Sequence, residues 1–300
     1  MRVLITGANG QLGTDLAFEL TKRNIDVVPA DLQETGRVLP EAYRRMDITD
    51  AGAVGTVLKE TEPDAVIHCA AWTNVDAAEK PENRDIVRKI NTEGTANIAE
   101  ACAETGAKML YLSTDYVFNG QGERPWKTDD AVEPLNWYGM TKQMGEAAVK
   151  KSLDRYFIVR TSWVYGLNGS NFVGKMLSLA DTHDSVRVVS DQIGSPTYTK
   201  DLAVLLSDMA GSERYGIYHA TNGGAFISFY ELCRTAFRLG GKTTEVIPVT
   251  TEEYGGNIAL RPKNSRLDKS KLAENGFEPL PEWEDALKRY LLERKEVLNG

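Results

Sequence analysis

Residues 7–13 read Gly7-Ala8-Asn9-Gly10-Gln11-Leu12-Gly13, and this stretch decides the fold. It follows an apolar run, residues 3–6, that is typical of a strand buried on both faces. It opens a segment, residues 10–23, whose leucines recur at helical spacing. A strand, a glycine-rich turn and a helix in this order predict a dinucleotide-binding turn.

The glycines of this turn have separate physical roles. Gly7 permits the tight turn, Gly10 lets the backbone approach a pyrophosphate, and Gly13 lets the helix pack against the strand. Asp31 stands 18 residues beyond Gly13, at the end of the second expected strand, where an acid can bind the hydroxyls of an adenosine ribose. This acid repels a 2′-phosphate and slightly favours NADH, whereas the nearby Arg37 keeps NADPH open. A glycine-rich turn that caps a helix without a ligand is the alternative.

The expected cofactor site extends along the ends of further strands. Small side chains at Ala70 and Ala71, after a strand expected at residues 65–69, leave room for a cofactor. Asp47 and Ile48 either cover the adenine or precede a helix. The residues expected from the chain to bind the cofactor are Gly7, Asn9, Gly10, Gln11, Leu12, Asp31, Asp47, Ile48, Ala70, Ala71, Thr73, Tyr138 and Lys142.

Strands and helices are expected to alternate through the first half of the chain. Strands are expected at residues 3–6, 26–30, 65–69, 108–113 and 156–160, and helices at residues 10–23, 85–104 and 138–150. This alternation predicts an α/β fold, a doubly wound parallel sheet of the Rossmann type with helices on both faces. We expect residues 1–165 to form mainly the NAD(P)-binding Rossmann domain. Residues 166–300 would form mainly a smaller, interleaved C-terminal substrate lobe, with some segments returning to the Rossmann domain.

The second half of the chain has a less regular pattern. Short strands are expected near residues 186–189 and 216–219, and helices near residues 171–180, 199–209, 228–239 and 282–298. No linker-like stretch marks a boundary between the two parts.

Tyr138-Gly139-Met140-Thr141-Lys142 is the second informative string of the chain. A tyrosine phenol has an ordinary pKa of about 10 and is a poor acid or base at neutral pH without help. Lys142, one helical turn along on the same face, would lower the pKa of Tyr138 and hold the nicotinamide ribose. Thr114, at the end of an expected strand, adds a hydroxyl for the reacting oxygen. Thr114, Tyr138 and Lys142 are the expected catalytic residues of a hydride and proton transfer.

These motifs resemble those of the extended short-chain dehydrogenase/reductase family and, within it, the dTDP-4-dehydrorhamnose reductases. The most specific strings are Ser113-Thr114-Asp115-Tyr116-Val117-Phe118 and Arg160-Thr161-Ser162-Trp163-Val164-Tyr165. The resembling stretches span nearly the whole chain and lie at residues 7–13, 70–76, 113–118, 134–142, 160–165, 171–172, 191–197 and 261–267.

The resemblance implies a reduction of the C4 keto group of dTDP-4-dehydro-β-L-rhamnose to dTDP-β-L-rhamnose with NADH or NADPH. Tyr138 would protonate the keto oxygen, and Arg261 would grip the diphosphate of the dTDP-sugar. Asn91 would join the cofactor-binding residues through the proton relay, or else be a helix-interior residue bonded to backbone. The expected substrate-binding residues are Thr114, Asp115, Trp163 and Arg261.

Two other functions stay open at this point. An epimerase or dehydratase of the same family keeps the cofactor site and the Tyr-Lys pair but returns the hydride to the sugar. A cofactor-binding regulatory subunit would do no chemistry. The retained Thr114, Tyr138 and Lys142 argue against the second alternative.

Composition and charge exclude several other classes. A net charge of −8 leaves no basic excess for a general nucleic-acid binder. The 3 cysteines are far apart and have no metal-ligand spacing, which indicates free thiols. No apolar run approaches the roughly 18 residues of a membrane span, so we expect a cytoplasmic protein without a membrane partner. It would be a monomer or a homodimer.

No metal is predicted. Some relatives are described as needing magnesium, bound by acidic residues at a dimer contact. Asp15 and the C-terminal acids would contribute to such a site, but Lys200 stands where we would expect another acid.

Overall fold

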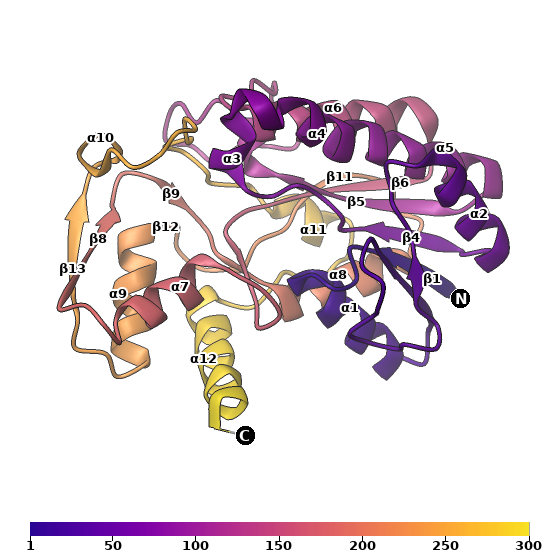
Figure 1. Cartoon of the computed structure of the whole chain (residues 1–300). Coiled ribbons are helices and arrows are strands. Elements are labelled where there is room, and N and C mark those ends of the chain that lie inside the picture. The colour runs from indigo at the N-terminus through magenta and orange to yellow at the C-terminus, as the bar shows by residue number, and fades with distance from the viewer. Residues whose placement is uncertain (300) are drawn as a thin grey trace.

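The computed structural model describes residues 1–299 and has a seven-stranded parallel sheet at its centre (Figure 1). The strand order is β11-β6-β5-β4-β1-β2-β3, which confirms the doubly wound fold. The strands are β1 (Arg2–Thr6), β2 (Asp26–Asp31), β3 (Arg44–Arg45), β4 (Ala65–His68), β5 (Lys108–Thr114), β6 (Tyr156–Thr161) and β11 (Gly216–His219). The chain order reverses between β1 and β4, and ligands of such sheets bind at this switch point.

Helices cover both faces of this sheet (Figure 1). One face carries α1 (Gln11–Lys22) and α8 (Thr199–Ala210), and the other carries α2 (Ala51–Thr61), α5 (Thr95–Thr105) and α6 (Trp137–Ser152). In β1, Val3 and Ile5 pack in the first layer and Leu4 in the second, which is why the strand is continuously apolar. The single helix expected at residues 85–104 consists of α4 (Arg84–Arg88), a π-helical turn (Lys89–Gly94) and α5.

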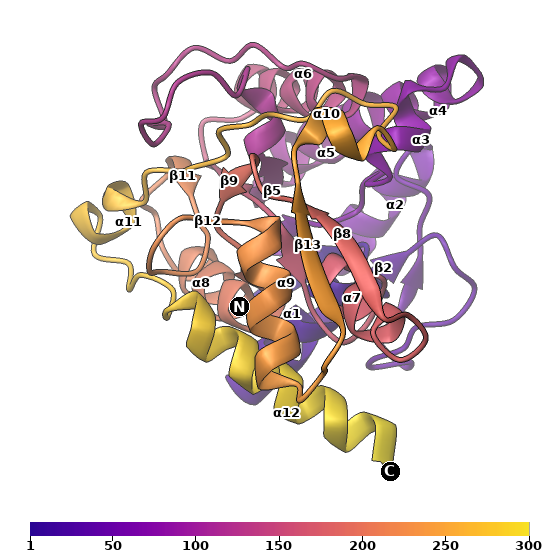
Figure 2. The ribbon, with the colours of Figure 1, turned by 90° about the vertical axis from the view of Figure 1, so that its left-hand side faces the viewer.

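The rest of the second half forms a separate layer around its own apolar core (Figure 2). Strand β8 (Ser185–Val189) pairs in parallel with β13 (Glu245–Val249). Helices α7 (Phe172–Leu179), α9 (Phe229–Leu239) and α12 (Trp283–Asn299) supply side chains to this core. The smaller elements are α3 (Val75–Glu79), α10 (Thr251–Tyr254), α11 (Ser270–Glu274) and the paired strands β7 (Val164–Tyr165) with β10 (Thr197–Tyr198) and β9 (Ile193–Gly194) with β12 (Ile227–Ser228).

Two segments from the second half lie in the central layers. Strand β11 pairs with β6 at one edge of the sheet, and α8 packs against α1. The division of the chain at residue 165 stays a prediction. In the part of the chain that the structure describes, no helix has both the length and the apolar character of a membrane span.

Candidate functional site

A cavity of about 1080 Å³ opens at the carboxyl ends of the central strands and reaches α7 and α9. It is lined by every residue expected to bind cofactor or substrate or to act in catalysis, with the single exception of Asn91. Residues from β1, β2, β5, α6 and the segment after β4 therefore meet in one cleft, although they are scattered along the chain.

The glycine turn at one end of the cleft has no room for side chains. Gly7 has a φ of +68°, and a Cβ on it would lie 2.7 Å from the backbone nitrogen of Ala70. A Cβ on Gly13 would lie 2.2 Å from the carbonyl oxygen of Gly7. The N-cap of α1 is Gly10, so no side chain satisfies the first N–H groups of this helix, and its first turn contains no acid. This cradle fits the pyrophosphate of a dinucleotide.

Asp31 and Arg37 both line the adenosine end of the cleft. The Asp31 carboxylate accepts hydrogen bonds from the backbone N–H groups of Asn9 (3.0 Å) and Leu32 (2.8 Å). The Asn9 side-chain oxygen accepts from the backbone N–H of Arg37 (2.8 Å). The carboxylate of Asp31 and the backbone of Arg37 are thus both bonded to Asn9, and the Arg37 side chain is exposed.

The cleft wall next to this end comes from the segments after β3 and β4. Asp47 and Ile48 both line the cleft, and the N-cap of α2 is Asp50, three residues further on. Ala70, Ala71 and Thr73 line the opposite part of the wall, where Ala70 donates its backbone N–H to the Thr6 hydroxyl (3.3 Å).

Asn91 lies behind the cleft wall and does not line the cleft, so its place among the cofactor-binding residues stays a prediction. It is fully buried in the π-helical turn. Its side-chain oxygen accepts from the backbone N–H of Trp72 (2.8 Å), and its amide donates to the Trp72 carbonyl and the Thr141 hydroxyl (3.2 Å each). Asn91 therefore links the segment around Trp72 to α6. These contacts agree with the alternative expectation, a helix-interior residue bonded to backbone.

Tyr138 and Lys142 face the cleft from α6, and both are buried around their polar atoms. Burial raises the pKa of Tyr138 to about 12, and the nearby Asp115 charge adds to this rise, while the Thr114 hydroxyl opposes it. Burial lowers the pKa of Lys142 to about 7, against the effect of Glu146. Burial dominates the pKa shifts of both groups, and the lowering of the Tyr138 pKa by the Lys142 charge stays a prediction.

Thr114 ends β5 and caps the short turn that follows. Its hydroxyl donates to the Asp115 carboxylate (3.0 Å) and accepts from the backbone N–H of Tyr116 (3.1 Å). Asp115 is buried, which raises its pKa to about 6. This pair places a hydroxyl and a carboxyl group beside Tyr138.

A buried ion pair near Tyr138 and Lys142 was not predicted from the sequence. Glu146 accepts two hydrogen bonds from the Arg160 guanidinium (2.9 and 2.8 Å) and one from the Ser113 hydroxyl (2.6 Å). Glu146 follows Lys142 by four residues on the same helix face, and this spacing was the available signal.

Trp163 and Arg261 line the far end of the cleft. Trp163 has a φ of +49° and stacks on Phe229 with ring centres 3.8 Å apart. The Arg261 guanidinium donates a hydrogen bond to the Asp76 carboxylate. This carboxylate also accepts hydrogen bonds from the backbone N–H groups of Ile258 and Ala259. Asp76 was not among the expected site residues, and it leaves other N–H groups of Arg261 for a ligand.

The acids named for a magnesium site have hydrogen-bond or ion-pair partners within the chain. Asp15 accepts a hydrogen bond from the Thr199 hydroxyl (2.5 Å). The Lys200 ammonium lies 2.5 Å from the Glu293 carboxylate, so a cation of the protein already neutralises this acid. No group of three or more metal-ligating side chains occurs among residues 1–299.

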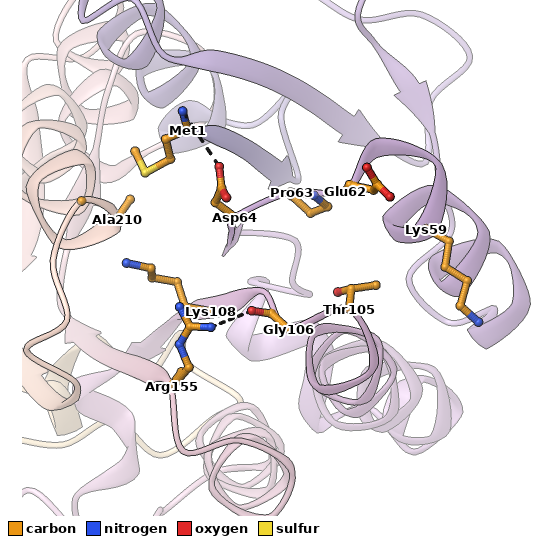
Figure 3. Close-up of a pocket in the computed structure, with 11 residues that line it drawn as sticks. Met1, Lys59, Glu62, Pro63, Asp64, Thr105, Gly106, Lys108, Arg155 and Ala210 are labelled. Carbon is orange, nitrogen blue, oxygen red and sulfur yellow. Dashed lines mark hydrogen bonds and ion pairs between the residues drawn. The ribbon is translucent and has the colours of Figure 1, made fainter.

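A second cavity, of about 840 Å³, lies at the opposite, amino edge of the sheet (Figure 3). The Arg155 guanidinium donates to the carbonyl of Gly106 after α5 (2.8 Å), and the Lys108 ammonium donates to the carbonyl of Ser212 after α8 (2.7 Å). Helix C-termini attract cations, so these charges are explained by the helix ends. None of the expected site residues lines this cavity.

Comparisons with known proteins agree on one family. The model of the RmlD substrate binding domain matches residues 1–296. A spore coat polysaccharide biosynthesis protein, SpsK, of Bacillus subtilis is 41% identical, covering 98% of this chain and 98% of the relative. A dTDP-4-dehydrorhamnose reductase of Streptomyces griseus is 42% identical, covering 95% of this chain and 91% of the relative. The crystal structure of a dTDP-4-dehydrorhamnose reductase of Bacillus anthracis in complex with NADP superposes with a TM-score of 0.90 at 42% identity, covering 97% of this chain and 99% of the other.

Proposed function

This chain belongs to the RmlD substrate binding domain family, and from that premise we propose that it is an NAD(P)H-dependent dTDP-4-dehydrorhamnose reductase. It reduces the C4 keto group of dTDP-4-dehydro-β-L-rhamnose to give dTDP-β-L-rhamnose. The observation that carries this proposal is the single cleft that holds the glycine turn together with Thr114, Tyr138 and Lys142.

The proposed chemistry divides between the cofactor and the protein. A reduced nicotinamide cofactor, held by the glycine turn and the wall around Ala70, supplies the hydride. Tyr138 donates its phenolic proton to the C4 oxygen, because a hydroxyl with a pKa of about 12 is protonated at neutral pH. When the sugar is bound, the Thr114 hydroxyl turns its one proton from the Asp115 carboxylate to the same oxygen, and Lys142 holds the nicotinamide ribose. The proton that leaves Tyr138 is replaced from solvent.

The sugar and its diphosphate would occupy the far end of the cleft. Trp163 and Phe229 form an aromatic wall for the sugar. Arg261 is held by Asp76, and its remaining N–H groups pair with the diphosphate. The relative named for spore coat polysaccharide biosynthesis supports a place in the supply of cell-surface polysaccharide precursors. The cytoplasmic location and the choice between monomer and homodimer stay predictions.

The first test is cofactor consumption with dTDP-4-dehydro-L-rhamnose. We expect loss of absorbance at 340 nm, with about one equivalent of reduced cofactor oxidised for each sugar reduced. A related epimerase or dehydratase returns the hydride and would show no net consumption. A regulatory subunit would bind the cofactor and leave the sugar unchanged. Either of these results would exclude the reductase.

NADH and NADPH are both proposed to serve as reductants, with Arg37 as the residue that accepts the 2′-phosphate. Replacing Arg37 with alanine should raise the KM for NADPH about tenfold and change the KM for NADH less than about twofold, because one charge-assisted contact is lost. The measurement is initial rate against the concentration of each cofactor. Arg44→Ala is the matched control, since Arg44 is exposed nearby on β3 and does not line the cleft. An equal change in both KM values for Arg37→Ala would contradict the assignment.

A further inference from the structure

A loop from the second half of the chain lies against the dinucleotide turn. Asn168, Gly169 and Ser170 line the cleft beside Gln11, the first residue of α1. The two segments approach so closely that a Cβ on Gly169 would lie 2.7 Å from the Gln11 side chain. The loop therefore covers the part of the cleft where the pyrophosphate is expected.

Two hydrogen bonds hold the loop to this turn. The Asn171 side-chain amide donates to the Gln11 side-chain oxygen (2.9 Å), and the Gln11 amide donates to the carbonyl of Ser170 (3.2 Å). The Asn171 amide also donates to the carbonyl of Gly166 at the start of the loop (2.7 Å). Asn171 thus closes the loop on itself and binds it to the first turn of α1.

The other side of Asn171 faces the substrate end. Its side-chain oxygen accepts from the backbone N–H of Gly174 (2.8 Å) and caps α7. The first residue of α7, Phe172, packs edge-on against Phe229 with ring centres 4.8 Å apart. Phe229 in turn stacks on Trp163, the wall proposed for the sugar. One side chain therefore has its donor on the cofactor side and its acceptor on the substrate side.

We propose that Asn171 is a positioning residue that retains the cofactor through Gln11 and orders the aromatic wall of the sugar site through the cap of α7. The sugar part of this inference rests on the proposed function, whereas the cofactor part does not. The amide N–H groups of Asn171 act on the cofactor through Gln11, and its oxygen acts on the sugar site through α7. Two substitutions therefore separate the two effects.

Asn171→Asp keeps the oxygen that caps α7, because Asp and Asn cap helices equally well. It loses both donated hydrogen bonds and brings a carboxylate against the Gln11 and Gly166 oxygens. We expect the rate of NADPH dissociation, measured by stopped-flow fluorescence without sugar, to rise about tenfold, as for the loss of two neutral hydrogen bonds. The KM for the sugar and kcat at saturating cofactor should change less than about twofold.

Asn171→Ala loses the cap of α7 as well and should raise both the dissociation rate of NADPH and the KM for the sugar.

Gln11→Met removes the hydrogen bonds of Gln11 with Asn171 and Ser170 and leaves the cap of α7 intact. It should raise the dissociation rate of NADPH to a similar extent, and the double variant Gln11→Met/Asn171→Asp should dissociate no faster than about twice either single variant. Additive effects, or a dissociation rate in Asn171→Asp equal to that of the unchanged protein, would overturn the proposal and leave Asn171 as a helix cap alone. If the unchanged protein binds NADPH but does not reduce the sugar, the proposed function fails, while the dissociation rates still test the contact of Asn171 with Gln11.

Discussion

Replacing Tyr138 with phenylalanine is expected to lower kcat about 10³-fold, within the range for loss of a general acid. The substitution removes one oxygen and keeps the ring, which packs edge-on against Tyr116 with centres 6.0 Å apart. The pocket should therefore keep its shape, and the dissociation constant of NADPH should change less than about threefold. The measurements are turnover from the absorbance at 340 nm and cofactor binding from fluorescence titration.

Tyr116→Phe is the matched control for this experiment. Tyr116 lines the same cleft, is next to Tyr138, and also has a pKa raised by burial. Because no proton transfer is assigned to it, its loss of hydroxyl should reduce kcat less than about fivefold. Turnover by Tyr138→Phe above about a tenth of the original rate, or an equal loss in Tyr116→Phe, would contradict the assignment of the acid.

The features that the sequence predicted well depend on neighbours along the chain. The glycine turn, the helical spacing of the leucines in α1 and the Tyr138–Lys142 pair are local patterns, and the structure has each on the expected element. The strands β1, β2, β4, β5 and β6 begin and end within one or two residues of the expected positions. Strand β13 was missed, because it is partly exposed and interrupted by Pro248.

The features that the sequence did not predict depend on contacts between distant segments. Asp76, which holds Arg261, lies 185 residues before it. Asn91 was expected among the cofactor-binding residues, and its position behind the wall depends on the backbone of Trp72 and the hydroxyl of Thr141. The burial that raises the pKa of Tyr138 was not predicted for a similar reason. Spacing on a helix gives the distance to Lys142, whereas desolvation depends on everything packed around both groups.

The buried ion pair between Glu146 and Arg160 is another contact between separate elements, α6 and β6. Both side chains are nearly fully buried, at 1% and 2% exposure. Two hydrogen bonds join them, and Arg160 also lies over the ring of Phe118 with 5.1 Å between the guanidinium carbon and the ring centre. A buried pair of this kind adds little net stability, but the loss of one partner leaves the other charge without compensation. The pair therefore makes α6, and with it Tyr138 and Lys142, sensitive to a single substitution.

Replacing Glu146 with alanine is expected to lower the free energy of unfolding by about 3–5 kcal/mol, because the Arg160 charge stays buried and unpaired. Urea unfolding followed by circular dichroism measures this change. The double variant Glu146→Leu/Arg160→Met, which removes both charges and keeps apolar volume, should recover most of the lost stability. A loss below about 1 kcal/mol in Glu146→Ala would mean that Arg160 finds another partner or water. Failure of the double variant to recover would mean that the Ser113 hydroxyl, which donates to Glu146, depends on this carboxylate as much as the guanidinium does.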